Sequence, residues 1–201
     1  MNAQARDEEL LAALLHFTLN HPSPDVARFH DALRNRGDTY EPVTPCMLAA
    51  AGLMETSVAG STGEEKRLLQ TFSRHGDHLR WEQSYRKTDG LVPDAMLDAY
   101  GFVEIIGARG PFVSERIRAG IGVWGPSIDY PRHHHQAEEV YILLAGSASF
   151  RLGDRDESDR YAGDAVYVES NLPHAFSSGT EGLTVCYLWQ AGDLRQISSF
   201  D

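Results

Sequence analysis

The sequence predicts a mainly β fold, in which several α-helices precede an antiparallel β-barrel. Two observations support this prediction. Apolar residues recur at helical spacing through roughly the first ninety residues, and from about residue 100 they recur at a period of two. Many short strands with Gly, Asp or Ser turns between them are typical of an antiparallel sandwich or barrel. We therefore expect a helical segment over residues 1–95 that packs on a β-barrel formed by residues 96–201.

Four start signals divide the helical segment. Acidic residues 7–9 precede a leucine stripe, and such residues suit the positive end of a helix dipole. Ser23-Pro24 is a capping serine with a first-turn proline, and Thr44-Pro45 repeats that signal. A further amphipathic helix is predicted over residues 61–72. The histidines of this segment are scattered, so we expect them to be solvated or packed in the core.

The barrel segment contains several predicted strands. They cover residues 102–106, 116–124, 140–144, 147–152, 165–168 and 183–189. The sequence shows no repeat of whole domains and no low-complexity linker before the first strand. The helices are therefore expected to cover the barrel rather than to form an independent unit.

Composition and charge argue against several classes of function. A formal net charge of −11 without a basic stripe disfavours binding to nucleic acid or to an anionic membrane. No apolar run approaches the roughly 20 residues that cross a bilayer. The N-terminus lacks the basic start of a secretory signal, so we expect a cytoplasmic protein. Cys46 and Cys186 are expected to be reduced thiols, and a single disulfide between them stays open.

The stretch from Tyr130 to Tyr141 is the most informative part of the chain. If it forms one regular strand, alternate side chains share a face, and Glu138 and His134 point away from the cavity. The side chains expected to point into one cavity are His133, His135, Glu139 and Tyr141. The alternative is a run of histidines on a solvated loop, which the spacing argues against. Periodicity alone does not decide whether Tyr141 belongs to a site or fills space.

A second segment, residues 163–176, places His174 after a turn. Imidazole and carboxylate ligands together suit Zn, Fe, Mn, Ni or Co and leave positions open for a substrate. The sequence therefore predicts one divalent transition metal ion. Trp189, at the end of the last strand, reads by itself as a core residue.

These residues resemble the two cupin motifs. The first appears as His133-x-His135-x3-Glu139-x6-Gly146, with its leading glycine displaced to Gly125. The second retains Gly163 and His174, but its proline, second glycine and asparagine are replaced by Glu169, Asn171 and Ser178. The ligand positions match, whereas the scaffold positions match loosely. The resemblance implies a barrel of the jelly-roll type.

A closer resemblance, which includes the helical half, is to the DddQ type of bacterial dimethylsulfoniopropionate (DMSP) lyase, a family of metal-dependent cupins. It implies cleavage of this small zwitterion into dimethyl sulfide and acrylate. His135, Glu139 and His174 would then be metal ligands, and Tyr141 would be a ligand, the catalytic base or both. Beside the substrate, the resemblance implies catalytic or binding roles for Tyr130 and His133 and a pocket-wall role for Trp189.

Other functions of the same fold stay open at this point. An Fe(II) dioxygenase would use the same ligands, and a sugar or keto-acid isomerase would be expected to carry basic residues for phosphate. A non-catalytic cupin that binds a small ligand is a further alternative. The sequence also leaves open whether the protein is a homodimer.

Overall fold

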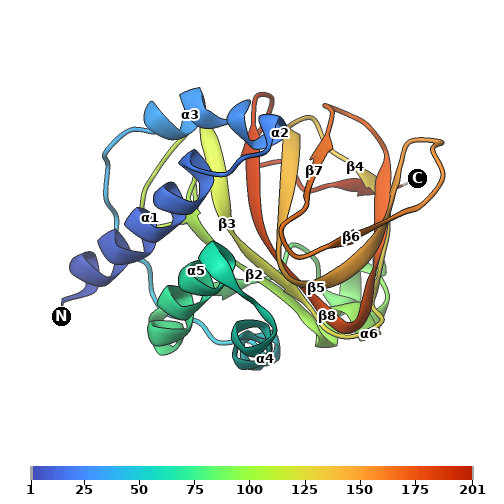
Figure 1. Ribbon diagram of the computed structural model, residues 1–201, viewed down its shortest axis with the longest axis horizontal. Coiled ribbons are helices and arrows are strands. Elements are labelled where there is room, and N and C mark those ends of the chain that lie inside the picture. Colours follow the sequence, from blue (N-terminus) through green and yellow to red (C-terminus); the bar gives the residue numbers. More distant parts are fainter. Residues whose placement is uncertain (1, 201) are drawn as a thin grey trace.

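The helices of residues 3–74 gather on one side of a curled β-sheet in the computed structural model, which describes residues 2–200 (Figure 1). The first helix begins where the side chain of Asn2 accepts a hydrogen bond from the backbone N–H of Ala5, as a helix cap does. Ser23 caps the second helix as predicted. The helices are α1 (Ala3–Leu19), α2 (Pro24–Ala27), α3 (His30–Arg34), α4 (Leu53–Gly60), α5 (Gly63–Arg74) and α6 (Asp94–Asp98), with short 3-10 turns at Ala49–Gly52, Gly76–His78 and Lys87–Asp89.

The helix predicted to start at Thr44-Pro45 is wrong. The chain stays extended there, and helical structure begins only at Ala49. The reason is a backbone pairing: Cys46 N–H donates to the Leu79 carbonyl, and Trp81 N–H donates to the Cys46 carbonyl. These hydrogen bonds satisfy the backbone in an extended conformation, so the local capping signal is overridden.

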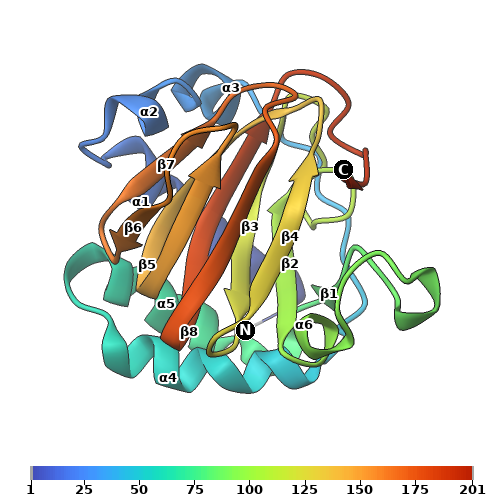
Figure 2. The same cartoon turned by 90° about the vertical axis from the view of Figure 1, so that its right-hand side faces the viewer.

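The strands form a nine-stranded sheet in which the pairs are antiparallel. Its order is β1-β2-β3-β8-β4-β9, and β5 pairs with β6, β7 and β8. Figure 2 shows β3, β4, β5 and β8 as the long central strands. The bounds are β1 (Trp81–Glu82), β2 (Tyr100–Ile106), β3 (Ile117–Trp124), β4 (Asp129–His134), β5 (Glu138–Leu152), β6 (Ser158–Tyr161), β7 (Ala165–Val168), β8 (His174–Gln190) and β9 (Ser199–Phe200).

Two strands are longer than the sequence predicts. The predicted strands 140–144 and 147–152 are one strand, β5, and β8 starts at His174 rather than at residue 183. Register shifts interrupt the pairing of β5 with β8 at Leu143/Ala145 and again at Gly146/Ala148. Gly146 has a φ of 75°, a conformation that glycine adopts without steric cost. The bulges interrupt the alternation of polar and apolar residues, although the strands continue.

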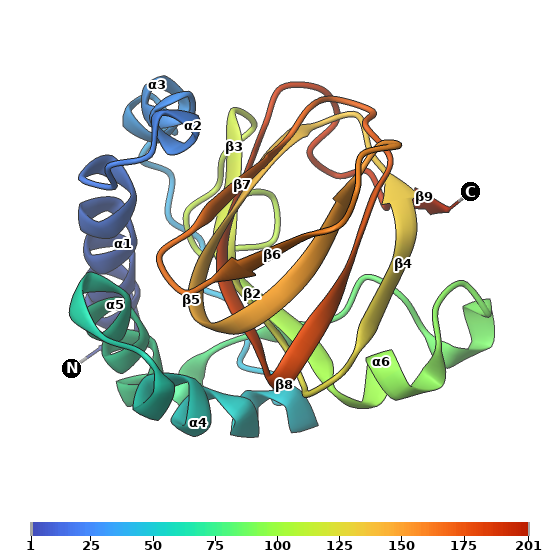
Figure 3. The same ribbon diagram turned by 45° about the vertical axis from the view of Figure 1, so that its right-hand side comes forward.

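The two faces of the sheet carry different residues. Even-numbered β5 residues such as Val140 and Ile142 pack with helices α1–α5, which lie along one side of the curled sheet (Figure 3). Odd-numbered residues such as Tyr141 and Leu143 belong to a second cluster inside the barrel, which is rich in aromatic rings. The predicted mainly β fold with helices before it is confirmed. The parity argument also placed the two faces of β5 correctly.

Two further observations concern the expectations from composition. Within residues 2–200, none of the helices combines the length and the apolar character needed to cross a membrane. Cys46 and Cys186 are both free thiols, the former exposed and the latter buried.

Candidate metal centre

Four buried side chains converge inside the barrel, and they come from three strands and a corner. His133 is on β4, His135 lies in the corner after β4, Glu139 is on β5 and His174 begins β8. His133 and His174 are direct cross-strand partners. The expectation of a single strand from Tyr130 to Tyr141 is wrong, because β4 ends at His134 and β5 starts at Glu138. The predicted side chains meet even so, since the corner folds β4 and β5 around the same interior.

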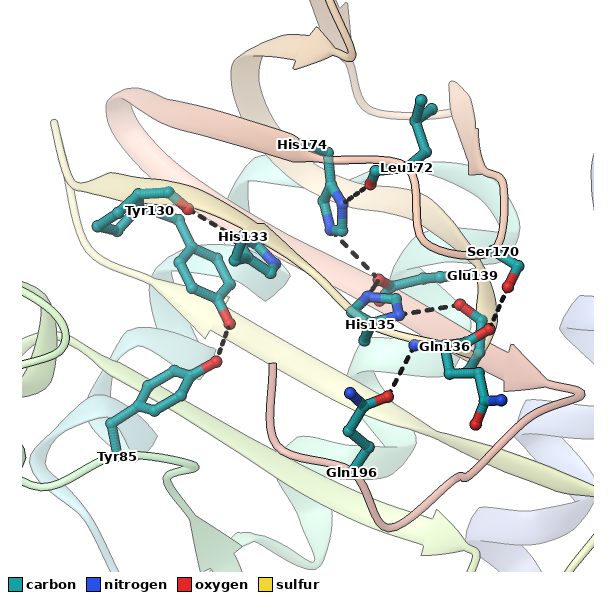
Figure 4. A network of polar contacts seen from close by, with 12 residues as sticks. Tyr85, Tyr130, His133, His135, Gln136, Glu139, Ser170, Leu172, His174 and Gln196 are labelled. Carbon is teal, nitrogen blue, oxygen red and sulfur yellow. Dashed lines mark hydrogen bonds and ion pairs between the residues drawn. The ribbon is translucent and has the colours of Figure 1, made fainter. Parts of the chain in front are cut away.

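The three histidines are held in the same way (Figure 4). In each, Nδ1 lies within hydrogen-bond distance of the carbonyl oxygen of a residue two positions away: Pro131 for His133 at 2.7 Å, Ala137 for His135 at 2.9 Å and Leu172 for His174 at 2.9 Å. A carbonyl only accepts, so this pattern assigns the proton to Nδ1 and leaves Nε2 as the electron-pair donor. Ligand atoms of the three rings lie within 4.8 Å of one another. That is the arrangement of imidazoles around a metal ion.

Glu139 adds a carboxylate to this cluster. Its Oε2 is 3.0 Å from His135 Nε2 and 3.8 Å from His174 Nε2. Glu139 is 2% exposed, and His174 Nε2 is buried without a hydrogen-bond partner among the described residues. An unprotonated Nε2 and a carboxylate oxygen both carry lone pairs, so their close approach requires a proton or a cation between them. The donor set therefore fits a divalent transition metal.

Burial also sets the charge of the imidazoles. Desolvation lowers the pKa of His174 to about 4, although the nearby Glu139 carboxylate acts in the opposite direction. Desolvation, followed by the neighbouring His174, holds the pKa of His133 well below its ordinary value. Both rings are therefore neutral near pH 7, which is the state in which a histidine binds a metal.

Tyr141 lies two residues beyond Glu139 on the same face of β5 and is 3% exposed. Burial raises its pKa well above the ordinary value of 10.0, and the charge of Glu139 and a hydrogen bond to it raise it further. In the protein alone Tyr141 is therefore a protonated phenol. A positive charge next to it would have to act against these effects to produce a phenolate.

Tyr130 and Tyr85 form a second group at the edge of the cluster. The ring of Tyr130 stacks on His133 with 4.1 Å between centroids, and its hydroxyl lies 2.9 Å from that of Tyr85 (Figure 4). No sequence pattern singles out Tyr85, which lies in an irregular stretch between β1 and the 3-10 turn at Lys87–Asp89. A residue with no periodic neighbours can only be found from the fold.

A pocket lies beside the cluster. Glu139, Tyr141 and Trp189 line it, together with other aromatic side chains, and the C-terminal segment 196–198 contributes to its wall. Trp189 is 8% exposed, and its indole stacks on the ring of His135 at 4.0 Å and 26°. Two buried charged residues that the sequence analysis missed, Arg118 and Glu104, lie at or behind the same wall.

The structure thus brings every predicted site residue to this interior. The residues in question are Tyr130, His133, His135, Glu139, Tyr141, His174 and Trp189, and all are buried. His133, for which the resemblance implied contact with substrate, lies in the same cluster as His135 and His174. The individual roles of these residues stay predictions.

Comparisons with known proteins agree on one family. Residues 26–185 match the profile of a family described as dimethylsulfoniopropionate lyase. The lyase DddQ of Ruegeria pomeroyi is 32% identical over 157 residues, which cover 78% of this chain and 77% of the relative. A crystal structure of DddQ from that organism superposes with a TM-score of 0.82 at 28% identity, over 98% of this chain and 96% of the other.

A second solved structure, from a study of the DMSP lyases RdDddP and RnDddQII, gives a TM-score of 0.83 over 100% of both chains. At 23% identity it supports the fold alone. Together these matches confirm the predicted cupin fold.

Proposed function

Because the chain belongs to the dimethylsulfoniopropionate lyase family, we propose that this carbon–sulfur lyase cleaves DMSP into dimethyl sulfide and acrylate with the help of one divalent metal ion. The observation that carries the metal-dependent part is the pair of lone-pair donors, His135 Nε2 and Glu139 Oε2, at 3.0 Å in a buried site. We infer that His135, Glu139 and His174 hold the ion. When bound, the ion would neutralise the substrate carboxylate, make the adjacent α-proton more acidic and lower the pKa of the Tyr141 phenol.

The reaction needs one base and no acid. The phenolate oxygen of Tyr141 would take the α-proton, and the electron pair of that C–H bond would form the carbon–carbon double bond. The β-carbon–sulfur bond breaks, and sulfur leaves with its bonding pair as neutral dimethyl sulfide. Tyr141 suits this role because it lies on the same face of β5 as Glu139, two residues away.

The aromatic interior suits the cationic end of the substrate. Tyr100 and Trp124 line the pocket and stack on each other at 5.1 Å, and Tyr130 lies within 6.2 Å of both ring centroids. Aromatic faces attract a sulfonium as they attract other cations, with about 0.5–2 kcal/mol per face. The aromatic side chains would also keep water away from the α-carbon and from the Tyr141 base.

Release of dimethyl sulfide into the headspace tests the proposed activity directly. Purified protein should release it from DMSP, and a chelator should abolish the release until Zn²⁺, Mn²⁺ or Fe²⁺ is added back. The reaction should also proceed without oxygen, since elimination consumes none; a strict oxygen requirement would indicate a dioxygenase instead.

A Tyr141→Phe variant tests the base. It should bind metal, because the imidazoles and Glu139 remain, and it should lose roughly 100-fold or more in kcat. Tyr161→Phe is the matched control, because Tyr161 is 60% exposed on β6. If Tyr141→Phe released dimethyl sulfide as fast as the wild type, another group would have to be the base.

A further inference from the structure

Arg118, Trp189 and Glu139 lie in one row across three neighbouring strands. Trp189 on β8 is the direct partner of Arg118 on β3 and of Glu139 on β5. Direct cross-strand partners point to the same face of a sheet, with Cβ atoms about 5 Å apart. Arg118 on β3 and Glu139, the candidate metal ligand on β5, therefore lie on opposite sides of β8, the strand that carries Trp189.

The indole of Trp189 has two charged or polar neighbours. It stacks on His135, in the corner after β4, at 4.0 Å, and the guanidinium carbon of Arg118 on β3 lies over its ring, 4.9 Å from the centroid. The indole of Trp189 therefore contacts both an imidazole and a guanidinium.

Glu104 fixes the guanidinium in turn. Arg118 Nε donates to Glu104 Oε2 at 2.7 Å, and the other carboxylate oxygen of Glu104 accepts from the backbone N–H of Arg109 at 2.7 Å. Arg118 and Glu104 are 6% and 5% exposed. Removing two charges from water costs several kcal/mol, and apolar residues of similar volume often stabilise a protein equally well. Stability alone therefore does not explain a buried ion pair in the wall of a pocket.

The orientation of His135 needs more than its one backbone contact. The hydrogen bond from Nδ1 to the Ala137 carbonyl fixes one edge of the ring but leaves it free to swing about that direction. A flat surface against the ring face removes this freedom. Trp189 supplies that surface, and the guanidinium of Arg118 over the indole ring limits how far Trp189 can move.

We propose that Glu104 and Arg118 are positioning residues that press Trp189 against His135 and so keep His135 Nε2 aimed at Glu139. This inference rests on the proposed metal site. It assigns a role to the planar guanidinium in particular, because a lysine in the same place would pair with Glu104 but could not stack on the indole.

Arg109 provides a matched control. It lines the same pocket, its Nε is 3.7 Å from the same Glu104 carboxylate, and its guanidinium lies over Phe102. Among the described residues, no cation–π contact joins Arg109 to Trp189. Arg109→Lys therefore changes a neighbouring arginine of the pocket without touching the row.

The experiment measures metal binding rather than turnover. Zn²⁺ affinity is determined by competition with a chromophoric chelator, and the visible spectrum of the Co²⁺-loaded protein reports the ligand geometry. Arg118→Lys should weaken Zn²⁺ binding about 10-fold and alter the Co²⁺ spectrum, as is usual when a partner of a metal ligand is lost. Arg109→Lys should leave both readouts unchanged.

A double-mutant cycle with Trp189→Phe separates positioning from a general structural effect. If Arg118 acts through Trp189, Arg118→Lys should add little to the loss in affinity that Trp189→Phe causes. Additive losses would overturn the proposed route. If Arg118→Lys does not fold, Glu104→Gln is used in its place, because that substitution weakens the ion pair but keeps the guanidinium. A Glu104→Gln variant with the Zn²⁺ affinity and Co²⁺ spectrum of the wild type would overturn the inference.

The two proposals fail in different ways. Wild-type protein that binds no Zn²⁺ or Co²⁺ would contradict the metal site itself. Wild-type protein that binds them normally, with an unaltered affinity and spectrum in Arg118→Lys, would contradict only the positioning role.

Discussion

Acid should destabilise the metal-free protein through His174. This ring is fully buried, and desolvation lowers its pKa from the ordinary 6.5 to about 4. The unfolded chain takes up a proton at His174 once the pH falls below about 6.5, whereas the folded chain does so only near pH 4. The free energy of unfolding therefore falls as the pH drops through this window. Below it, both states are protonated and the contribution no longer changes.

The size of the effect follows from the interval between the two pKa values. The interval from 6.5 down to about 4 corresponds to about 3 kcal/mol at 1.36 kcal/mol per pH unit. His133, whose pKa is also lowered by burial, acts in the same direction. Such a loss is a large share of the roughly 5–15 kcal/mol that stabilises a typical domain.

Urea unfolding of chelator-treated protein between about pH 7.5 and about pH 4 measures this loss. A His174→Gln variant should lose about 3 kcal/mol less than the wild type over that range. His16→Gln is the control, because His16 is exposed on α1. If His174→Gln and wild type showed the same pH dependence, His174 would not be held as a desolvated neutral ring. Saturating Zn²⁺ should stabilise the protein most at the upper end of this range, because protons compete with the metal.

Three substitutions test other parts of the site. His133→Ala should retain Zn²⁺ binding but raise KM for DMSP several-fold; a loss of Zn²⁺ as complete as in His135→Ala would make His133 a ligand. Tyr85→Phe should lower the free energy of unfolding by about 1–3 kcal/mol in urea titrations, because the buried Tyr130 hydroxyl loses the hydroxyl that lies 2.9 Å away. An unchanged midpoint of urea unfolding would mean that water takes the place of the Tyr85 hydroxyl. Gly120→Ala should lower Tm sharply, because a Cβ there would lie 1.8 Å from the Val103 carbonyl oxygen, whereas Gly52→Ala, with open space around it, should be neutral.

The sequence identified which residues meet in the candidate site better than it predicted the path of the chain that brings them together. Alternation within β5 correctly assigned Glu139 and Tyr141 to the interior and Glu138 to the other face. The same rule was applied across a corner, where it has no physical basis, because residues 135–137 belong to no strand. His133 and His135 reach the interior through the pairing of β4 with β8 and through the turn. No local pattern encodes that pairing.

The buried ion pair could not be predicted at all. Glu104 and Arg118 lie in segments that are otherwise apolar, and a charged residue in an alternating strand is normally read as facing solvent. Both faces of β2 and β3 are buried, one by the helices and one by the barrel interior. Only the assembled sheet shows that these two charges face each other. The helical half covers the outer face of these strands, and Glu104 and Arg118 pair on the barrel side.

The charges of the interior explain why a divalent ion would suit the proposed site. Glu104 and Arg118 neutralise each other, and His133 and His174 are held neutral by burial. Glu139 is a buried acid whose close neighbours include His135 and His174, and the substrate would bring a carboxylate together with its sulfonium cation into the same low-dielectric space. A divalent ion held by Glu139 would keep positive charge for the substrate carboxylate, while the aromatic walls would face the sulfonium.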